Sequence, residues 1–117
     1  MDFHHEFSKT VEAFPSIEGL IFADPDGESI LFEAPDMDGF DVKLAGAKMP
    51  ILMQVFGWRD LVTAPTFMEL TYQDKFIMAI KLTQFYSITV VCHDLTQRFL
   101  LKRHLETLAV KFNQEIY

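Results

Sequence analysis

The feature that most constrains the fold is the stretch over residues 41–58, DVKLAGAKMPILMQVFGW. At about 100° per residue, the helical period places its apolar side chains on two separate faces. The first face comprises Leu44, Ile51, Val55 and Trp58. The second face comprises Val42, Ala45, Met49, Leu52, Met53 and Phe56, with Lys48 at the border between the two. A helix that is apolar over most of its circumference has to be buried on more than one side. Since a single sheet covers one side, we expect the other to meet a second protein chain.

The same stretch contains a proline inside the predicted helix. Pro50 cannot donate a hydrogen bond back to the carbonyl of Gly46. Either the helix bends there, or a second helix begins with Pro50 in its first turn. We favour one bent helix, because Gly46 leaves room for the bend, and we expect Asp41 to be its N-cap.

The remaining elements follow from hydrophobic periodicity along the chain. Phe3, Phe7, Val11 and Phe14 form one stripe of a first helix that ends before Pro15. Continuous or alternating apolar runs predict strands over residues 17–23, 28–34, 66–72, 76–82 and 86–92. A Pro-Asp-Gly turn at residues 24–27 joins the first two strands into a hairpin, and short turns join the last three into a meander. A capping-box pattern at residues 94–97 predicts a last helix that runs to about residue 115.

These elements predict one α+β domain over residues 1–117, in the order α-β-β-α-β-β-β-α. Both terminal helices have a single apolar stripe, whereas the middle helix has two. A five-stranded antiparallel sheet satisfies all of these patterns if the terminal helices lie on one face and the middle helix on the other.

Composition limits the classes of partner. The chain has 17 acidic and 10 basic residues, a formal charge of −7, which argues against nucleic acid and against anionic membrane surfaces. No apolar stretch approaches the roughly 20 residues that a membrane span needs. The N-terminal MDFHHEFSK has no basic flank followed by an apolar run, so we expect no secretory signal, no membrane insertion and a cytoplasmic location.

Residues suited to catalysis or metal binding do not form a known spacing. The chain has no HExxH, paired CxxC, GxSxG or phosphate-binding loop. We interpret Cys92 as a buried apolar residue, and His93 with Asp94 as a solvated or capping pair. The acidic residues at 24–28 and at 36–41 lack the twelve-residue loop of a calcium site, so we interpret them as turns. The sequence therefore predicts no catalytic residue, no cofactor, no metal and no enzyme.

Three segments carry a resemblance to a known family. They are the opening IEGLIFADPDGESILF, the small-residue LAGA in the middle helix, and MAIKLTQFYSITVVCHD before the leucine-rich last helix. Together with the order of elements, they resemble the roadblock/LC7 family, which includes dynein roadblock light chains and bacterial MglB-type proteins. The chain departs from that family at Pro50, and at the last hairpin, where Thr83-Gln84-Phe85 has no glycine.

The resemblance implies a dimer, either with itself or with a related roadblock chain. Middle helices would pack side by side and third strands would pair edge to edge. It also implies a regulator that binds a Ras-like small GTPase and modulates its nucleotide cycle, or alternatively a structural adaptor without effect on GTP hydrolysis. Arg59 is the one arginine near this interface, and we assign it a structural role, so we expect no arginine finger. The predicted dimer or partner interface comprises Ala45, Gly46, Met49, Met53, Phe56, Phe67 and Glu69.

A third hypothesis is a PAS- or profilin-like ligand sensor, which requires a pocket between a helix and the sheet. The bulky Phe, Leu and Met side chains argue against it, because they predict a filled interior.

Overall fold

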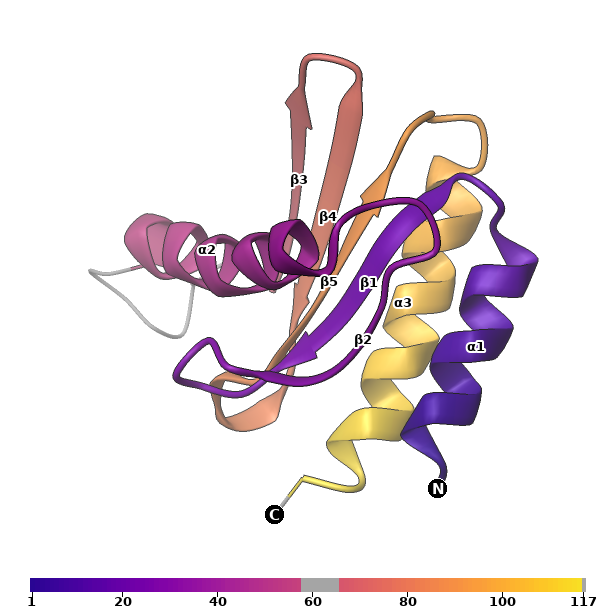
Figure 1. Ribbon diagram of the computed structural model, residues 1–117. Coiled ribbons are helices and arrows are strands. Elements are labelled where there is room, and N and C mark those ends of the chain that lie inside the picture. The colour runs from indigo at the N-terminus through magenta and orange to yellow at the C-terminus, as the bar shows by residue number, and fades with distance from the viewer. Residues whose placement is uncertain (58–65, 117) are drawn as a thin grey trace.

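The computed structural model describes residues 1–57 and 66–116 and confirms the predicted order of elements (Figure 1). The helices are α1 (Phe3–Ala13), α2 (Gly39–Gly57) and α3 (Arg98–Asn113), with a short 3-10 helix, η1 (Thr83–Phe85). The strands are β1 (Ile17–Ala23), β2 (Ser29–Glu33), β3 (Phe67–Tyr72), β4 (Lys75–Lys81) and β5 (Ser87–Cys92). None of the described helices is long and apolar enough to cross a membrane.

The strands form one antiparallel sheet in the order β2-β1-β5-β4-β3. The predicted hairpin is β1 with β2, and the predicted meander is β3, β4 and β5. At the first turn, Asp24 Oδ1 accepts hydrogen bonds from the backbone of Asp26 and Glu28, both at 2.9 Å, and Gly27 has a φ of 82°. Every residue of β1 and β5 is buried, because these two strands lie at the middle of the sheet with helices on both faces.

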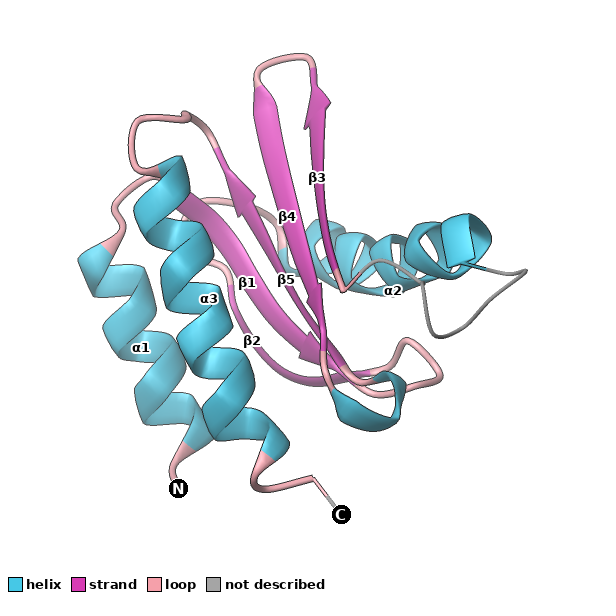
Figure 2. Cartoon of the chain, turned by 180° about the vertical axis from the view of Figure 1, so that it is seen from behind, coloured by secondary structure: helices cyan, strands magenta, loops and turns pink. Residues whose placement is uncertain are grey.

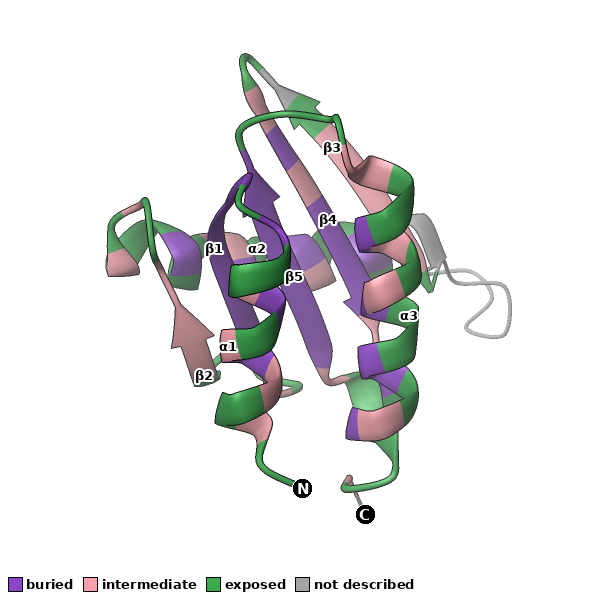
Figure 3. Ribbon diagram, turned by 90° about the vertical axis from the view of Figure 1, so that its right-hand side faces the viewer, coloured by how far each residue is buried: buried purple, intermediate pink, exposed green. Residues whose placement is uncertain are grey.

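The helices form two layers, as predicted. α1 and α3 lie side by side on one face of the sheet, and α2 crosses the other (Figures 1 and 2). The larger core lies under α1 and α3, whose inner sides are buried (Figure 3). There the Phe112 ring lies 4.5 to 5.7 Å from the rings of Phe3, Phe7 and Phe22.

α2 is one helix that continues through Pro50, so the expectation of a single helix is confirmed. The N-cap prediction at Asp41 is wrong, because the helix begins two residues earlier, at Gly39. Asp38 Oδ1 accepts a hydrogen bond from the backbone of Phe40 at 2.7 Å, and its carbonyl accepts one from Val42 at 3.2 Å. Asp38 therefore satisfies the first turn that had been assigned to Asp41.

The capping box predicted before the last helix is also absent. Asp94 Oδ1 accepts a hydrogen bond from the backbone of Thr96 at 3.0 Å, and α3 begins only at Arg98. Aspartate side chains compete for nearby backbone donors in this way, and the resulting turn takes the place of a helical one.

The turn without glycine adopts backbone angles that glycine would adopt more easily. Gln84 and Phe85 have φ values of 57° and 67°. A hydrogen bond of 2.8 Å from the Thr83 backbone to Asn113 Oδ1 ties this turn to the end of α3. The departure from the family pattern is thus accommodated by a left-handed turn anchored to a helix.

The close approach of α2 to the sheet depends on Gly46. A Cβ atom at this position would lie 2.8 Å from Cγ2 and 2.9 Å from Cδ1 of buried Ile21. Gly46→Val should therefore force α2 away from β1 and lower the free energy of unfolding by about 2 kcal/mol, a typical penalty for overpacking. Urea unfolding followed by circular dichroism measures this change. The matched control is Lys48→Val on the exposed side of the same helix, and equal losses for the two variants would contradict the packing role of Gly46.

A histidine lies between the two helices of the larger layer. His104 Nε2 lies 2.7 Å from Thr10 Oγ1, whose hydroxyl donates to the Glu6 carbonyl at 2.8 Å. Since that hydroxyl hydrogen is already used, His104 Nε2 donates to Thr10. Burial lowers the pKa of His104 below its ordinary value; the charges of Lys111 and Lys9 lower it further, and that of Glu6 opposes them.

This lowered pKa makes stability depend on pH. The unfolded chain takes up a proton at His104 near pH 6.5, whereas the folded chain does so only at lower pH, so protonation favours unfolding. The free energy of unfolding should therefore be fully retained above about pH 6.5 and fall as the pH drops below it. Urea unfolding at several pH values should show a smaller loss for His104→Gln, which keeps a donor for Thr10. His5→Gln, at an exposed position, should keep the full loss, and identical pH profiles for both variants would refute the role of His104.

Candidate functional site

The outer face of α2 carries an exposed apolar row. Phe40, Leu44, Ile51 and Val55 are 70%, 40%, 60% and 56% exposed, and Leu52 beside them is 37% exposed. We call these five residues the α2 stripe. They include three members of the first face identified in the sequence. The fourth, Trp58, lies outside the described residues, as does Arg59.

The buried side of α2 carries Val42, Met49 and Met53 of the second face, whereas Leu52 of that face belongs to the α2 stripe. Met49 and Met53 are 3% and 4% exposed and form a small core with Ala79, against which β3 and β4 side chains pack. Gly46 packs directly against the side chain of Ile21. The sheet is therefore covered by the face that supplied four of the predicted interface residues, because the glycine and the unbranched methionines let the helix approach its own sheet. Ala45 is half-buried at the edge of this contact, and the side chain of Phe56 is outside the described part of the chain.

The two interface residues predicted on β3 point to the other layer. Phe67 packs against the core under α3, and its ring lies 4.6 Å from Lys102 Nζ. Glu69 Oε2 lies 3.0 Å from a terminal nitrogen of Arg98. The structure thus brings Met49 and Met53 together on one face of the sheet and Phe67 and Glu69 on the opposite face. Contact of any of these residues with a partner stays a prediction.

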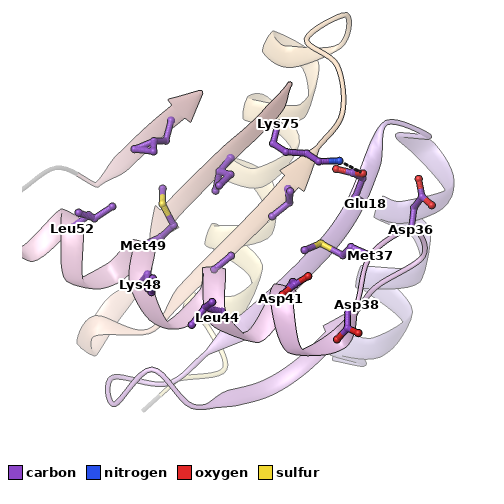
Figure 4. A pocket seen from close by; sticks show the side chains of 14 residues that line it. Glu18, Asp36, Met37, Asp38, Asp41, Leu44, Lys48, Met49, Leu52 and Lys75 are labelled. Carbon is purple, nitrogen blue, oxygen red and sulfur yellow. Dashed lines mark hydrogen bonds and ion pairs between the residues drawn. The ribbon is translucent and has the colours of Figure 1, made fainter. Parts of the chain in front are cut away.

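A groove of about 680 Å³ lies beside the α2 stripe, between α2 and the sheet (Figure 4). Leu70, Ile77 and Val91 form an apolar floor on three adjacent strands. The α2 wall consists of Leu44, Ala45, Lys48, Met49 and Leu52, and the end near the β2–α2 loop carries Glu18, Asp36, Met37, Asp38, Asp41 and Lys75. The prediction of a filled interior is therefore correct under α1 and α3 and wrong under α2. The reason is that α2 contacts the sheet through one narrow row of side chains.

The C-terminal half of α2 lies near one edge of the sheet, because Met68 and Leu70 of β3 pack against the core of Met49, Met53 and Ala79. β3 pairs with β4 on one side and with no other described strand. An edge strand presents unpaired backbone donors and acceptors, which another chain can use. A helix face, a groove and a strand edge thus adjoin on one side of the molecule.

The charged end of the groove contains a buried carboxylate. Glu18 is 6% exposed, and its Oε1 accepts a hydrogen bond of 2.6 Å from Lys75 Nζ, which raises the pKa of that lysine (Figure 4). Ligand atoms of Glu18, Asp36 and His93 all lie within 4.8 Å of one another. The sequence pattern did not predict this cluster, because Asp36 lies in a loop of several acidic residues and His93 lies next to Asp94. The sequence feature that could have indicated the cluster is Glu18, the single charged residue inside the apolar run IEGLIFA.

The buried cysteine does not provide a nucleophile. Cys92 is 1% exposed, and burial raises the pKa of its thiol to about 11, although a hydrogen bond from Ser16 acts in the opposite direction. A thiol with this pKa remains protonated near neutral pH and is a poor nucleophile. The interpretation of Cys92 as a buried apolar residue is consistent with this placement.

Comparison with known proteins finds likeness in structure. No protein-family model matches the sequence, and no curated protein matches it. A Roadblock/LC7 domain from Streptomyces avermitilis superposes with a TM-score of 0.82 at 12% identity, over 98% of each chain. Myxococcus xanthus MglB gives a TM-score of 0.77 at 8% identity, over 97% of this chain and 96% of its own. An MglB structure described as a tetrameric arrangement gives 0.74 at 10% identity, over 95% of this chain and 85% of its own.

These likenesses agree with the observed layers, strand order and element order. At identities of 8 to 12%, the likeness to these structures establishes the architecture. The chain has the roadblock/LC7 fold.

Proposed function

We propose that this chain is a non-enzymatic, dimeric regulator that binds a Ras-like small GTPase in the cytoplasm and modulates its nucleotide cycle. The observation that carries the proposal is the α2 stripe beside the edge strand β3. The likeness to MglB structures, one of them described as tetrameric, supports self-association as the first step.

The α2 stripe has the length and character of an interface. Its ends, Phe40 and Val55, are separated by about 22 Å along the helix axis at 1.5 Å per residue. Several large apolar side chains exposed along one helix are uncommon on monomeric proteins and favour a site of association. Branched Ile51 and Val55 lose little conformational entropy when they are buried, so they suit a packed contact.

A second copy of the chain fits this surface by symmetry. In an antiparallel pair of α2 helices, Leu44 of one copy would face Val55 of the partner, with Ile51 near the two-fold axis. Each copy would also present β3 at the same side, so that two sheets could continue into one. Both features use surfaces that the single chain leaves exposed.

Surface charge supports a basic partner for the assembled dimer. The net charge of −7 favours association with proteins that carry positive patches and increases the rate of encounter with them. No group in the described part of the chain is arranged as an activated nucleophile. A regulatory effect would therefore act through the partner's own catalytic residues.

The dimer can be tested at the α2 stripe. The unmodified protein should sediment at micromolar concentration with twice the 13.5 kDa mass of one chain. Ile51→Glu and Val55→Glu should shift it to one chain mass, because each would replace an apolar side chain at the contact with a carboxylate that has to lose its hydration. Gln54→Glu makes the same charge on the same helix outside the stripe and should leave the dimer intact. A one-chain mass for the unmodified protein would refute the dimer.

The regulatory role can be tested with a Ras-like GTPase encoded in the same genome. The protein should bind one nucleotide state more tightly than the other and change the rate of GTP hydrolysis measured by phosphate release. Ile51→Glu should reduce both effects, whereas Gln54→Glu should not. Absence of binding to either state of every such GTPase would refute this function. A stable complex with an unchanged hydrolysis rate would instead establish a structural adaptor.

A further inference from the structure

We propose that Glu18, Asp36 and His93 bind a divalent first-row transition metal ion, with Zn²⁺ as the probe, at the charged end of the α2 groove. We call these three residues the Glu18 cluster. Two carboxylates and one imidazole form a mixed oxygen and nitrogen donor set, which suits Zn²⁺ better than Mg²⁺ or Ca²⁺. The proposal is independent of GTPase binding.

The spacing of the three side chains fits a shared ion. Their ligand atoms lie within 4.8 Å of one another. Donor atoms around a divalent ion with bonds of about 2.1 Å are roughly 3 to 4 Å apart, so small rotations suffice. Glu18 is buried, whereas Asp36 and His93 are exposed. His93 Nε2 also lies 3.6 Å from Asp94 Oδ2, an exposed contact that a bound ion would replace.

The backbone holds the three ligands together from segments far apart in the sequence. Glu18 is the extra residue where the pairing of β1 with β5 shifts, since Ile17 pairs with Cys92 and Gly19 with Val91. Such bulges redirect side chains. The Asp36 backbone donates to the Glu18 carbonyl at 3.1 Å, and the His93 backbone donates to the Ser16 carbonyl at 3.0 Å. These two backbone hydrogen bonds therefore hold Asp36 and His93 close to the segment that contains Glu18.

An unpaired buried oxygen points to a missing ligand. Glu18 Oε1 is paired with Lys75, but Oε2 is buried and has no hydrogen-bond partner. A buried carboxylate oxygen without a partner carries a desolvation penalty. A cation bound by this oxygen together with Asp36 and His93 would remove that penalty.

Lys75 is not a proposed ligand, but its charge affects the affinity of the Glu18 cluster for a metal ion. Its ammonium group competes with a metal ion for the charge of Glu18, but its side chain is 42% exposed and can move into water. The groove carries a further carboxylate at Asp41, so the region remains favourable for a cation. Removal of the Lys75 charge should therefore strengthen metal binding, whereas removal of the Glu18 charge should weaken it.

A metal ion explains the cluster better than a basic side chain from a partner. A guanidinium group is satisfied by the carboxylates alone and gains little from an imidazole, whereas neutral imidazole is a preferred ligand of Zn²⁺. The position of His93 beside the two carboxylates therefore favours the ion.

The test is calorimetric titration of the full chain with ZnCl₂, in a background of His4→Gln and His5→Gln that removes the exposed N-terminal imidazoles. One ion should bind per chain. Glu18→Gln, Asp36→Asn and His93→Gln should each weaken binding by about tenfold or more. The matched control is Asp38→Asn, which makes the same change in the same loop and still caps α2, and it should stay within about twofold because it keeps all three ligands.

Two further variants separate metal binding from a structural ion pair. Lys75→Met should tighten Zn²⁺ binding several-fold. The double variant Glu18→Gln with Lys75→Met has no buried charge at this pair, so it should fold, as circular dichroism can verify, and should not bind. Failure of the unmodified cluster to bind Zn²⁺ at millimolar concentration would overturn the proposal. Equal affinities for the parent protein and the Glu18→Gln variant, or no gain from Lys75→Met, would also overturn it.

Discussion

The pairing of β1 with β5 is the constraint on which the rest of the structure depends. It joins the N-terminal hairpin to the C-terminal meander, and it places two fully buried strands at the centre of the sheet. Because both faces of this pair are apolar, each must be covered. α1 and α3 cover one face as a pair, whereas α2 covers the other without a second described helix beside it. The unequal cover of the two faces is the origin of both the groove and the α2 stripe.

The unequal cover also explains why α2 is so apolar. Its contact with the sheet needs only Val42, Met49 and Met53 as large side chains, with Gly46 between them. The apolar row around Ile51 is not needed for that contact. Its place on the solvent side is the observation that supports the proposed contact with a second chain.

Periodicity predicted the elements and the layers well, because each terminal helix has one stripe and each strand is a continuous or alternating apolar run. It could not decide which face of α2 lies on the sheet, since both faces are apolar and the choice depends on how closely Gly46 approaches Ile21. Helix starts were misplaced because Asp38 and Asp94 form local turns that compete with the expected caps. The Glu18 cluster was missed because its members are brought together by strand pairing over long sequence distances.

Glu18 also shows how the fold tolerates a charge in its central strand. A carboxylate in the middle of β1 would be surrounded by apolar side chains, and its desolvation would oppose folding. At the start of the strand, the bulge directs the carboxylate toward the open end of the groove, where Lys75 and solvent-exposed side chains can reach it. The groove that α2 leaves uncovered is therefore what makes this buried charge possible. Because α2 alone covers this face of the sheet, the molecule exposes the apolar α2 stripe and, separately, the charged end of the groove around Glu18.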